Sequence, residues 1–156
     1  MNPFLRDNPV IRELEPGETQ LAFPALRTLR TDVEGPDAFV KRVDQELRPV
    51  GYRLVGAFVK GNADAVSVAG FRLVRNLAWG DHLFLDDLST VASARRYGYA
   101  EALLEWLATE AKNLDLPQLH LDSAHGPERT HAHRLYFKAG FRIAAHHFAR
   151  DGATPP

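Results

Sequence analysis

The sequence contains no cysteine. This absence excludes disulfide bonds, thiolate nucleophiles, CxxC redox motifs and cysteine-ligated zinc. No apolar run approaches the 18 residues of a membrane-spanning helix, so no membrane association is predicted. The first ten residues lack the hydrophobic region of a signal peptide, which favours a cytoplasmic location.

An excess of charge of one sign is also missing. The 19 Lys and Arg residues nearly balance the 20 Asp and Glu residues. Because nucleic-acid-binding domains usually carry a strong basic excess, no nucleic-acid partner is predicted. A chain of 156 residues can bury a core without a disulfide or a metal. We therefore predict a single domain over residues 1–156, with loosely held ends at 1–9 and 150–156.

Several catalytic signatures are absent. The sequence has no Walker G-x-x-x-x-G-K-[ST] loop, no dinucleotide G-x-G-x-x-G motif and no G-x-S-x-G nucleophile elbow. The histidines lack chelating spacing as well. His131 and His133 are two apart on a predicted helix, and His146 and His147 are adjacent on a predicted strand, so each pair points apart. We predict no metal site.

Strand and helix patterns alternate along the chain. Hydrophobic alternation predicts strands at residues 10–14, 52–60, 65–74, 82–91, 118–122 and 141–149. Helical spacing and breakers predict helices at residues 19–30, from 36 to the break at 49–51, 98–114 and 132–139, and Gly140 sits where a C-terminal capping glycine belongs. These patterns predict an α/β fold, with helices on both faces of one mixed, mostly antiparallel sheet.

The segment Arg95-Arg-Tyr-Gly-Tyr-Ala100 connects a predicted strand to the long helix that begins at Gly98. Backbone N–H groups at a helix start are unpaired and carry a partial positive charge, which suits a pyrophosphate. Gly98 and Ala100 allow close approach of the backbone, and the two arginines add permanent cations. On spacing alone, a plain strand-to-helix turn with solvated arginines stays open.

A second informative segment is the predicted helix and its end, Ala132-His-Arg-Leu-Tyr-Phe-Lys-Ala-Gly-Phe141. Together with the arginine loop and the strand LFLDDLSTV, it resembles the GNAT superfamily of acyl-CoA-dependent N-acetyltransferases. The loop is similar to the family's Q/R-x-x-G-x-G/A motif, and the helix to its A-x-x-(F/L)-Y-x-x-x-G-F motif. The resemblance covers residues 65–149 well. It implies a GNAT-like sheet splayed between the fourth and fifth strands, and acetyl-CoA as co-substrate.

The resemblance also implies where acetyl-CoA binds. Backbone groups of Leu88 and Thr90 would pair with the pantetheine arm as an extra strand would, and the arginine loop would hold the phosphates. Arg129 stands where the family often has an asparagine that touches pantetheine, so its guanidinium has a phosphate or a substrate carboxylate as alternative partners. The implied set is Leu88, Ser89, Thr90, Arg95, Arg96, Tyr97, Gly98, Tyr99, Ala100, Glu101 and Arg129.

Three residues are candidates for the chemistry. Tyr136 sits where the family often has a tyrosine whose hydroxyl meets the CoA sulfur, where it would protonate the departing thiolate or hydrogen-bond it. Asp86 is the first candidate for the base or the ammonium anchor, with Asp87 second. Strand alternation predicts that the two carboxylates lie on opposite faces, and that Phe84, Asp86 and Leu88 share one face. The resemblance implies that this shared face looks into the cleft where the acceptor amine sits. Salt bridges to arginines are the alternative role for both aspartates.

Other polar groups are weaker candidates. A backbone N–H near Leu88–Ser89 is the candidate oxyanion donor. His120 and Asp122 share a predicted strand face and could line the acceptor pocket, as could His146 or His147. Surface or core hydrogen bonding is the alternative for all four. The aromatic side chains of Tyr52, Trp79 and Phe84 are candidates for shaping an apolar acceptor site, with core packing as the alternative.

We predict an N-acetyltransferase in which a primary amine, of a small molecule or of a protein, attacks acetyl-CoA directly in a ternary complex. Without cysteine, a cysteine-linked acyl intermediate is excluded. The alternative is a non-catalytic CoA-binding sensor or interaction domain of the same fold. The apolar final segment, FRIAAHHFA, leaves pairing across a sheet edge in a homodimer open.

Overall fold

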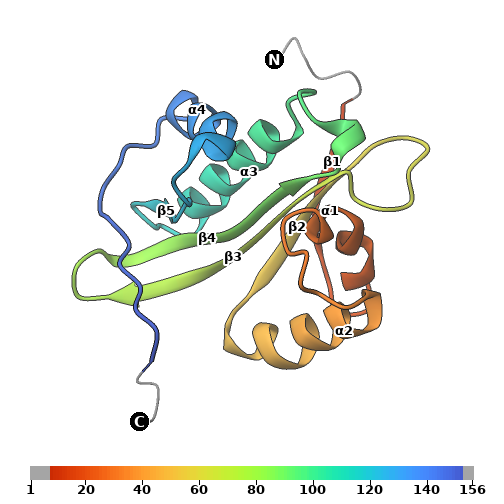
Figure 1. Cartoon of the computed structure of the whole chain (residues 1–156), viewed down its shortest axis with the longest axis horizontal. Coiled ribbons are helices and arrows are strands. Elements are labelled where there is room, and N and C mark those ends of the chain that lie inside the picture. The colour runs from red at the N-terminus through yellow and green to blue at the C-terminus, as the bar shows by residue number, and fades with distance from the viewer. Residues whose placement is uncertain (1–7, 153–156) are drawn as a thin grey trace. The chain divides into compact units, whose positions relative to one another are not determined.

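The computed structural model describes residues 8–152 (Figure 1). The chain divides into two compact units, Met1–Leu121 and Asp122–Pro156, which are taken in turn. Within the described part, no helix combines the length and the apolar character needed to cross a membrane. Residues 8–9 and 150–152 have no regular secondary structure, and the rest of the two predicted loose ends lies outside the described residues.

The first unit contains a five-stranded sheet whose strands lie in chain order. Its strands are β1 (Val10–Leu14), β2 (Arg53–Phe58), β3 (Ser67–Asn76), β4 (Gly80–Thr90) and β5 (Leu119–Leu121). The first four strands pair antiparallel, and β5 pairs parallel with β4. The sheet is therefore mixed and mostly antiparallel, and the predicted α/β class is confirmed.

The helices of this unit are α1 (Phe23–Arg27), α2 (Pro36–Lys41) and α3 (Tyr99–Asn113), with 3-10 turns at Thr19–Ala22, Arg48–Val50 and Ala92–Ala94 and a π-helical segment at Arg42–Leu47. They cover both faces of the sheet (Figure 1). On one face, Trp106 of α3 meets the ring of Phe71 on β3, with 5.9 Å between centroids. On the other face, the Ser89 hydroxyl of β4 donates to the Ala25 carbonyl of α1 at 2.6 Å.

Strand alternation places buried apolar side chains on both faces of the sheet. On the α1 face, Leu14, Leu54 and Val68 of three neighbouring strands are fully buried beneath the short helices. On the α3 face, Phe71 and Leu83 pack beneath the apolar stripe of α3. Successive side chains of a strand point to opposite faces, so a sheet covered on both sides needs apolar residues in both registers.

The predicted helix at 19–30 is shorter and interrupted. A 3-10 turn covers Thr19–Ala22, and α1 ends at Arg27. Pro24 explains the interruption, because it has no N–H to donate to the carbonyl four residues earlier and is tolerated only in the first turn of a helix. The helix that begins after Gly35 and ends before Gly51 is confirmed, although its second half is π-helical and then 3-10.

The second unit contains one α-helix, α4 (Thr130–Lys138), among its described residues. It ends in a Schellman motif: the Phe141 N–H donates to the Tyr136 carbonyl at 3.0 Å, and the Gly140 N–H to the Phe137 carbonyl at 3.1 Å. Gly140 has φ +87°, the left-handed conformation that this motif requires and that glycine adopts without strain. The prediction of a C-terminal glycine cap is confirmed.

The predicted final strand at 141–149 is wrong. This segment has no regular secondary structure, and Ile143 and Phe148 are exposed. Alternating apolar residues indicate which faces a strand would present, but a strand exists only where a second strand accepts its hydrogen bonds. No such partner is found among the described residues.

Candidate active site

A β-bulge lies in the middle of β4. The ladder with β3 pairs Phe71 with Leu85 and then Gly70 with Asp87, which leaves Asp86 without an opposite residue. A bulge of this kind breaks the alternation of side chains and of backbone groups along a strand. Because the bulge lies at Asp86, it determines which face of the sheet the later side chains of β4 point to, and which edge their backbone groups face.

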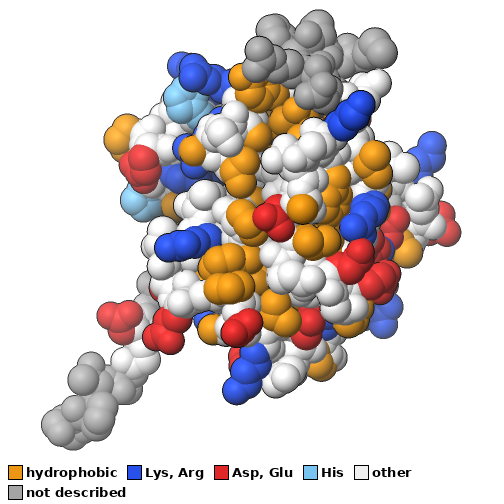
Figure 2. Space-filling model, turned by 90° about the vertical axis from the view of Figure 1, so that its right-hand side faces the viewer, with side chains coloured by type: hydrophobic (Ala, Val, Ile, Leu, Met, Phe, Trp, Pro, Cys, Tyr) orange, Lys and Arg blue, Asp and Glu red, His pale blue; other side chains and the backbone are white. Residues whose placement is uncertain are grey.

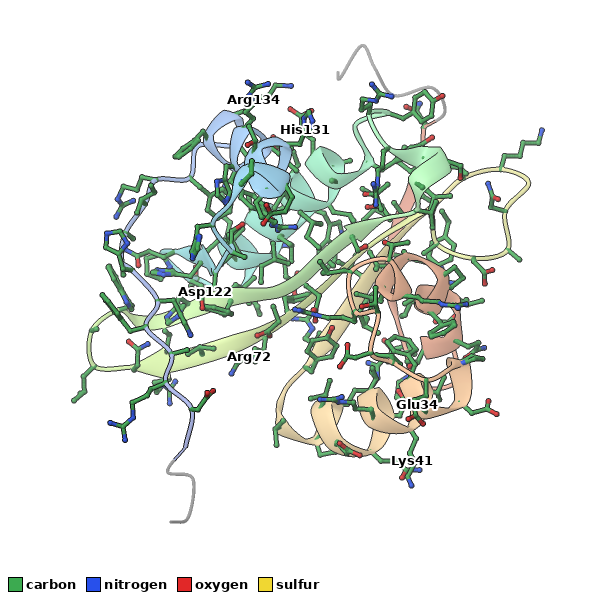
Figure 3. All side chains as sticks on the ribbon, viewed as in Figure 1. Glu34, Lys41, Arg72, Asp122, His131 and Arg134 are labelled. Atoms are coloured by element: carbon green, nitrogen blue, oxygen red, sulfur yellow. The ribbon has the colours of Figure 1, made fainter. Side chains whose placement is uncertain are left out.

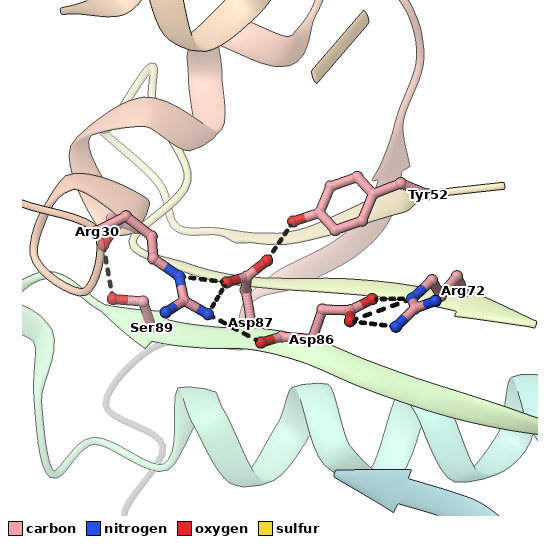
Figure 4. Close-up of polar contacts among 7 residues, drawn as sticks. Arg30, Tyr52, Arg72, Asp86, Asp87 and Ser89 are labelled. Carbon is pink, nitrogen blue, oxygen red and sulfur yellow. Dashed lines mark hydrogen bonds and ion pairs between the residues drawn. The ribbon is translucent and has the colours of Figure 1, made fainter. Parts of the chain in front are cut away.

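The bulge places both carboxylates on the α1 face of the sheet (Figure 4). Asp87 lies opposite Gly70, and Asp86 reaches Arg72, the next residue of β3 on the same face as Gly70. Leu88 pairs with Ala69 and faces the α3 side instead. The prediction that the two aspartates lie on opposite faces, and that Leu88 shares a face with Asp86, is therefore wrong, because the extra residue restarts the alternation.

The carboxylate of Asp87 is bound on both oxygens. Oδ1 accepts from Arg30, which follows α1, at 2.8 Å from Nε, and Oδ2 accepts from the Tyr52 hydroxyl at 2.7 Å. Burial, together with the charge of Asp87, raises the pKa of Tyr52 well above its ordinary value. Gly70 makes room for this contact, since a Cβ at that position would collide with the Tyr52 hydroxyl.

The carboxylate of Asp86 is bound by a single guanidinium. Arg72 Nε lies 2.9 Å from Oδ2, and its Nη2 lies 3.1 Å from Oδ1. The Arg72 guanidinium also lies over the Phe84 ring, 5.4 Å from its centroid. The contact with Asp86 raises the pKa of Arg72. The ion pair joins two strands that are already paired, and 44% of the Arg72 side chain is exposed.

Beyond the bulge, the outer edge of β4 is open. On the β5 side, the Leu83 N–H donates to the Gln118 carbonyl at 3.1 Å, and on the β3 side the Val91 N–H donates to the Val66 carbonyl at 2.9 Å. Backbone N–H and C=O groups alternate in direction along a strand. Because those of Val91 face β3, those of Thr90 and Leu88 face away from β3. β5 pairs only with residues 83–85 of β4, so no described strand covers this edge.

The arginine loop leads from this edge into α3. Gly98 is the N-cap, with φ +81° and no side chain capping the helix. The first intrahelical hydrogen bond runs from the Ala102 N–H to the Gly98 carbonyl. The backbone N–H groups that precede Ala102 therefore take no part in the hydrogen bonds of the helix. Arg95 and Arg96 are exposed, and Arg95 Nε contacts the Thr90 carbonyl at 3.4 Å. Arg96 has φ +66°, a strained conformation for a residue with a side chain.

Tyr136 belongs to the second unit. The Schellman motif brings its ring against Phe141, with 5.9 Å between centroids. Burial raises the pKa of the Tyr136 hydroxyl, and the contact with Arg129 acts in the opposite direction. A hydroxyl with a raised pKa stays protonated at neutral pH, so it is available as a proton donor. Arg129 therefore has Tyr136 as a partner within this unit.

The remaining candidates are held by local contacts. His120 lies on β5 opposite Phe84, and its ring packs at a tilt against those of Trp79 and His82. Asp122 follows β5 and pairs with His147 at 2.9 Å. The His146 ring meets the Phe148 ring edge to face in the segment that forms no strand. Over residues 8–152, no three histidines or acidic residues converge in a way that could hold a metal ion.

Comparison with known proteins shows the family of this chain. The family model described as "Acetyltransferase (GNAT) family" matches residues 19–141. The chain belongs to the GNAT acetyltransferase family. A curated relative, the uncharacterized N-acetyltransferase YhdJ of Bacillus subtilis (strain 168), is 28% identical over 130 residues, which cover 83% of this GNAT chain and 88% of the relative.

Solved structures share the GNAT fold. An acetyltransferase of Trypanosoma brucei superposes with a TM-score of 0.74 at 18% identity, covering 92% of this chain and 99% of the other. The aminoglycoside N-acetyltransferase AAC(6')-Iy in complex with CoA gives 0.73 at 17%, covering 95% and 97%. A ribosomal-protein-alanine N-acetyltransferase of Brucella melitensis biovar Abortus 2308 gives 0.76 at 19%, covering 92% and 99%.

Sequence reasoning missed two residues of the candidate site, Arg30 and Arg72. The position of Arg72 could have been predicted by counting residues from the hairpin turn. The pairing of Asn76 with Gly80 places Arg72 opposite Phe84 and diagonal to Asp86. Arg30 gave no such signal. It follows a short helix and meets Asp87 across 57 positions of sequence, a contact that only tertiary packing creates.

Proposed function

We propose that this GNAT protein transfers an acetyl group from acetyl-CoA to a primary amine by direct attack in a ternary complex. The observation that carries the proposal is the continuity of two features in the first unit. The open β4 edge at Leu88 and Thr90 leads into the uncapped N-terminus of α3, with two exposed arginines between them. An extended arm with amide groups fits the first feature, and a pyrophosphate fits the second.

The same geometry supports a position for the reacting thioester. With its phosphates at the start of α3, the pantetheine arm runs along β4 toward the bulge. It cannot extend past Leu85, because β5 occupies the edge from there on. The strand between Leu85 and Thr90 spans about 17 Å at roughly 3.4 Å per residue, a length suited to the extended arm. The reactive end of the arm then lies beside Asp86 and Asp87. The CoA held by AAC(6')-Iy is consistent with this use of the fold.

The proposed reaction involves three changes in the bound reactants. The acceptor ammonium loses a proton, its nitrogen forms a bond to the thioester carbon, and the carbon–sulfur bond breaks. The products are the acetylated amine and the CoA thiol, with one proton released to solvent. In our proposal, Asp86 anchors the ammonium, and a backbone N–H near Leu88–Ser89 stabilises the oxyanion.

Tyr136 is the proposed donor of the proton that the leaving thiolate takes. This assignment rests on the motif around Tyr136 and on its raised pKa, which keeps the hydroxyl protonated at neutral pH. We expect Tyr136→Phe to lower kcat by about 10²-fold or more, since general acid catalysis contributes on that scale. The affinity for acetyl-CoA, measured by calorimetry, should change little. Unchanged turnover in a folded Tyr136→Phe variant would remove the tyrosine from the mechanism.

The function itself is tested by an amine panel with acetyl-CoA and a thiol reagent. Because the protein has no cysteine, every thiol detected comes from released CoA. We expect saturable acetyl-CoA binding and thiol release that depends on one class of amine. Binding without transfer to any amine would favour a CoA-binding sensor of the same fold. No binding at all would contradict both functions.

A further inference from the structure

The ion pairs of the first unit differ in what they hold together. Arg53 bridges Glu13 on β1 and Glu110 on α3, and so ties the sheet to a helix. Arg48 binds Asp44, and also donates to the Leu14 carbonyl of β1. Apart from the local contact between Arg48 and Asp44, these contacts join elements that are distant in sequence.

Arg72 and Asp86 form a different kind of pair. They connect β3 to β4, which the backbone ladder already joins over most of their length. Partly exposed ion pairs of this kind contribute little to stability, because water screens the two charges. The fold therefore has little need of this pair, yet it lies at the bulge, where the proposed function puts the thioester. Its location is better explained by recognition than by stability.

The two carboxylates at the bulge also differ in availability. Both carboxylate oxygens of Asp87 are bound, by Arg30 and Tyr52 from two distant segments of the chain, and 13% of the Asp87 side chain is exposed. Among the described residues, the Asp86 carboxylate is bound by Arg72 alone, and 23% of the Asp86 side chain is exposed. An incoming ammonium can therefore approach Asp86, and the guanidinium that it displaces from Asp86 is then available to an anion.

We propose, resting on the proposed function, that the acceptor is a free amino acid, recognised as a zwitterion by Asp86 and Arg72. Asp86 binds the ammonium that is acetylated, and Arg72 binds the carboxylate of the same molecule. The planar guanidinium suits a carboxylate because two parallel N–H groups match its two oxygens. The Phe84 ring beneath Arg72 limits how far the guanidinium can move.

The charge of the site disfavours the other amines. Asp86 and Asp87 are matched by Arg72 and Arg30, so the bulge carries no excess negative charge to attract a polyamine or an aminoglycoside. On the face of the molecule that Figure 2 shows, acidic and basic side chains are interspersed without a large area of one sign. A protein N-terminus is positive in the same way but has an amide in place of the carboxylate, so it leaves Arg72 without an anion.

The experiment compares amino acids with their primary amides. Leucine, phenylalanine and methionine are each assayed beside leucinamide, phenylalaninamide and methioninamide, using acetyl-CoA and thiol detection. We expect the wild type to favour the acids by at least about tenfold in kcat/KM. Arg72→Gln should bring the acid-to-amide ratio down about tenfold or more, because it removes the carboxylate partner, and Arg72→Lys should restore part of the preference.

Arg75→Gln is the matched control. Arg75 lies three residues along β3 and binds Asp81 of β4 through two contacts of 2.6 Å, on the other face of the same hairpin. Arg72 itself is visible on β3 in Figure 3. Because acids and amides differ in amine basicity, the deciding quantity is the change of the ratio in Arg72→Gln relative to Arg75→Gln, with melting temperatures checked for both.

The outcomes separate the two proposals. An equal ratio in both variants, or transfer to amides, polyamines or peptide N-termini without preference for the acids, would overturn the zwitterion proposal and leave the acetyltransferase function standing. Acetyl-CoA binding with no transfer to any amine would overturn the acetyltransferase function, and the zwitterion proposal with it. An acid preference lost only in Arg72→Gln would support both.

Discussion

The surroundings of Tyr52 strongly favour the protonated form of its hydroxyl. The phenol is buried and donates to Asp87, so the folded protein holds the hydroxyl proton at pH values where a free tyrosine releases it. A group whose pKa is raised on folding stabilises the native state fully below its unfolded pKa. That contribution is lost as the pH rises through the folded pKa. Tyr52 should therefore make the folded protein less stable as the pH rises into the alkaline range.

Tyr52→Phe tests this linkage. At pH 7 we expect the variant to be less stable by about 1–3 kcal/mol, because Asp87 loses a buried donor. Above about pH 10, where an unfolded tyrosine ionises, wild-type stability should fall and the gap between the two proteins should narrow. Urea unfolding from pH 7 to 11 measures both. A gap that stays constant or widens across that range would contradict the linkage. Asp87→Asn, which removes the charge facing the phenol, should also show a shallower alkaline decline.

At the scale of elements, α4 depends on its C-terminal cap. Gly140 is left-handed, and the two capping hydrogen bonds fix the end of the helix beside Tyr136. We expect Gly140→Ala to destabilise the helix by about 1–3 kcal/mol, the cost of a left-handed residue with a side chain. Hydrogen exchange over residues 130–138 should rise accordingly.

Gly152→Ala is the matched control for the cap. An added Cβ there meets nothing within 4 Å, and Gly152 is not among the glycines with a positive φ, so we expect neither stability nor exchange to change. Equal behaviour of the two alanine variants would show that the cap does not determine the end of α4.

At the scale of the whole molecule, binding of acetyl-CoA should raise the melting temperature. A ligand at about 100 times its Kd adds about 2.7 kcal/mol to the free energy of unfolding. For a domain of this size, that corresponds to several degrees. Arg95→Gln combined with Arg96→Gln should weaken acetyl-CoA binding about tenfold or more and reduce the shift, because both cations stand at the uncapped start of α3.

Lys41→Gln serves as the charge-matched control for these arginines. Lys41 ends α2, which lies on the other face of the sheet from α3, and Figure 3 shows its side chain projecting from that helix. We expect its acetyl-CoA affinity and thermal shift to equal those of the wild type. A thermal shift that survives loss of both loop arginines undiminished would place the phosphates elsewhere.

The sequence by itself predicted what depends on neighbours along the chain. The apolar stripe of α3, its start at Gly98 and the glycine cap of α4 are all local, because a helix satisfies its own hydrogen bonds. The arginine loop was visible for the same reason, as a few consecutive residues between a strand and a helix. The family and the fold class followed from these local patterns in their order.

Tertiary structure decided what depends on pairing between distant segments. The bulge at Asp86 arises from the register of β3 against β4, and it alone put both carboxylates on one face and turned Leu88 and Thr90 toward the open edge. The segment 141–149 has the pattern of a strand but no partner to pair with. A strand cannot complete its own hydrogen bonds, so its face, its register and its very existence are set by another strand.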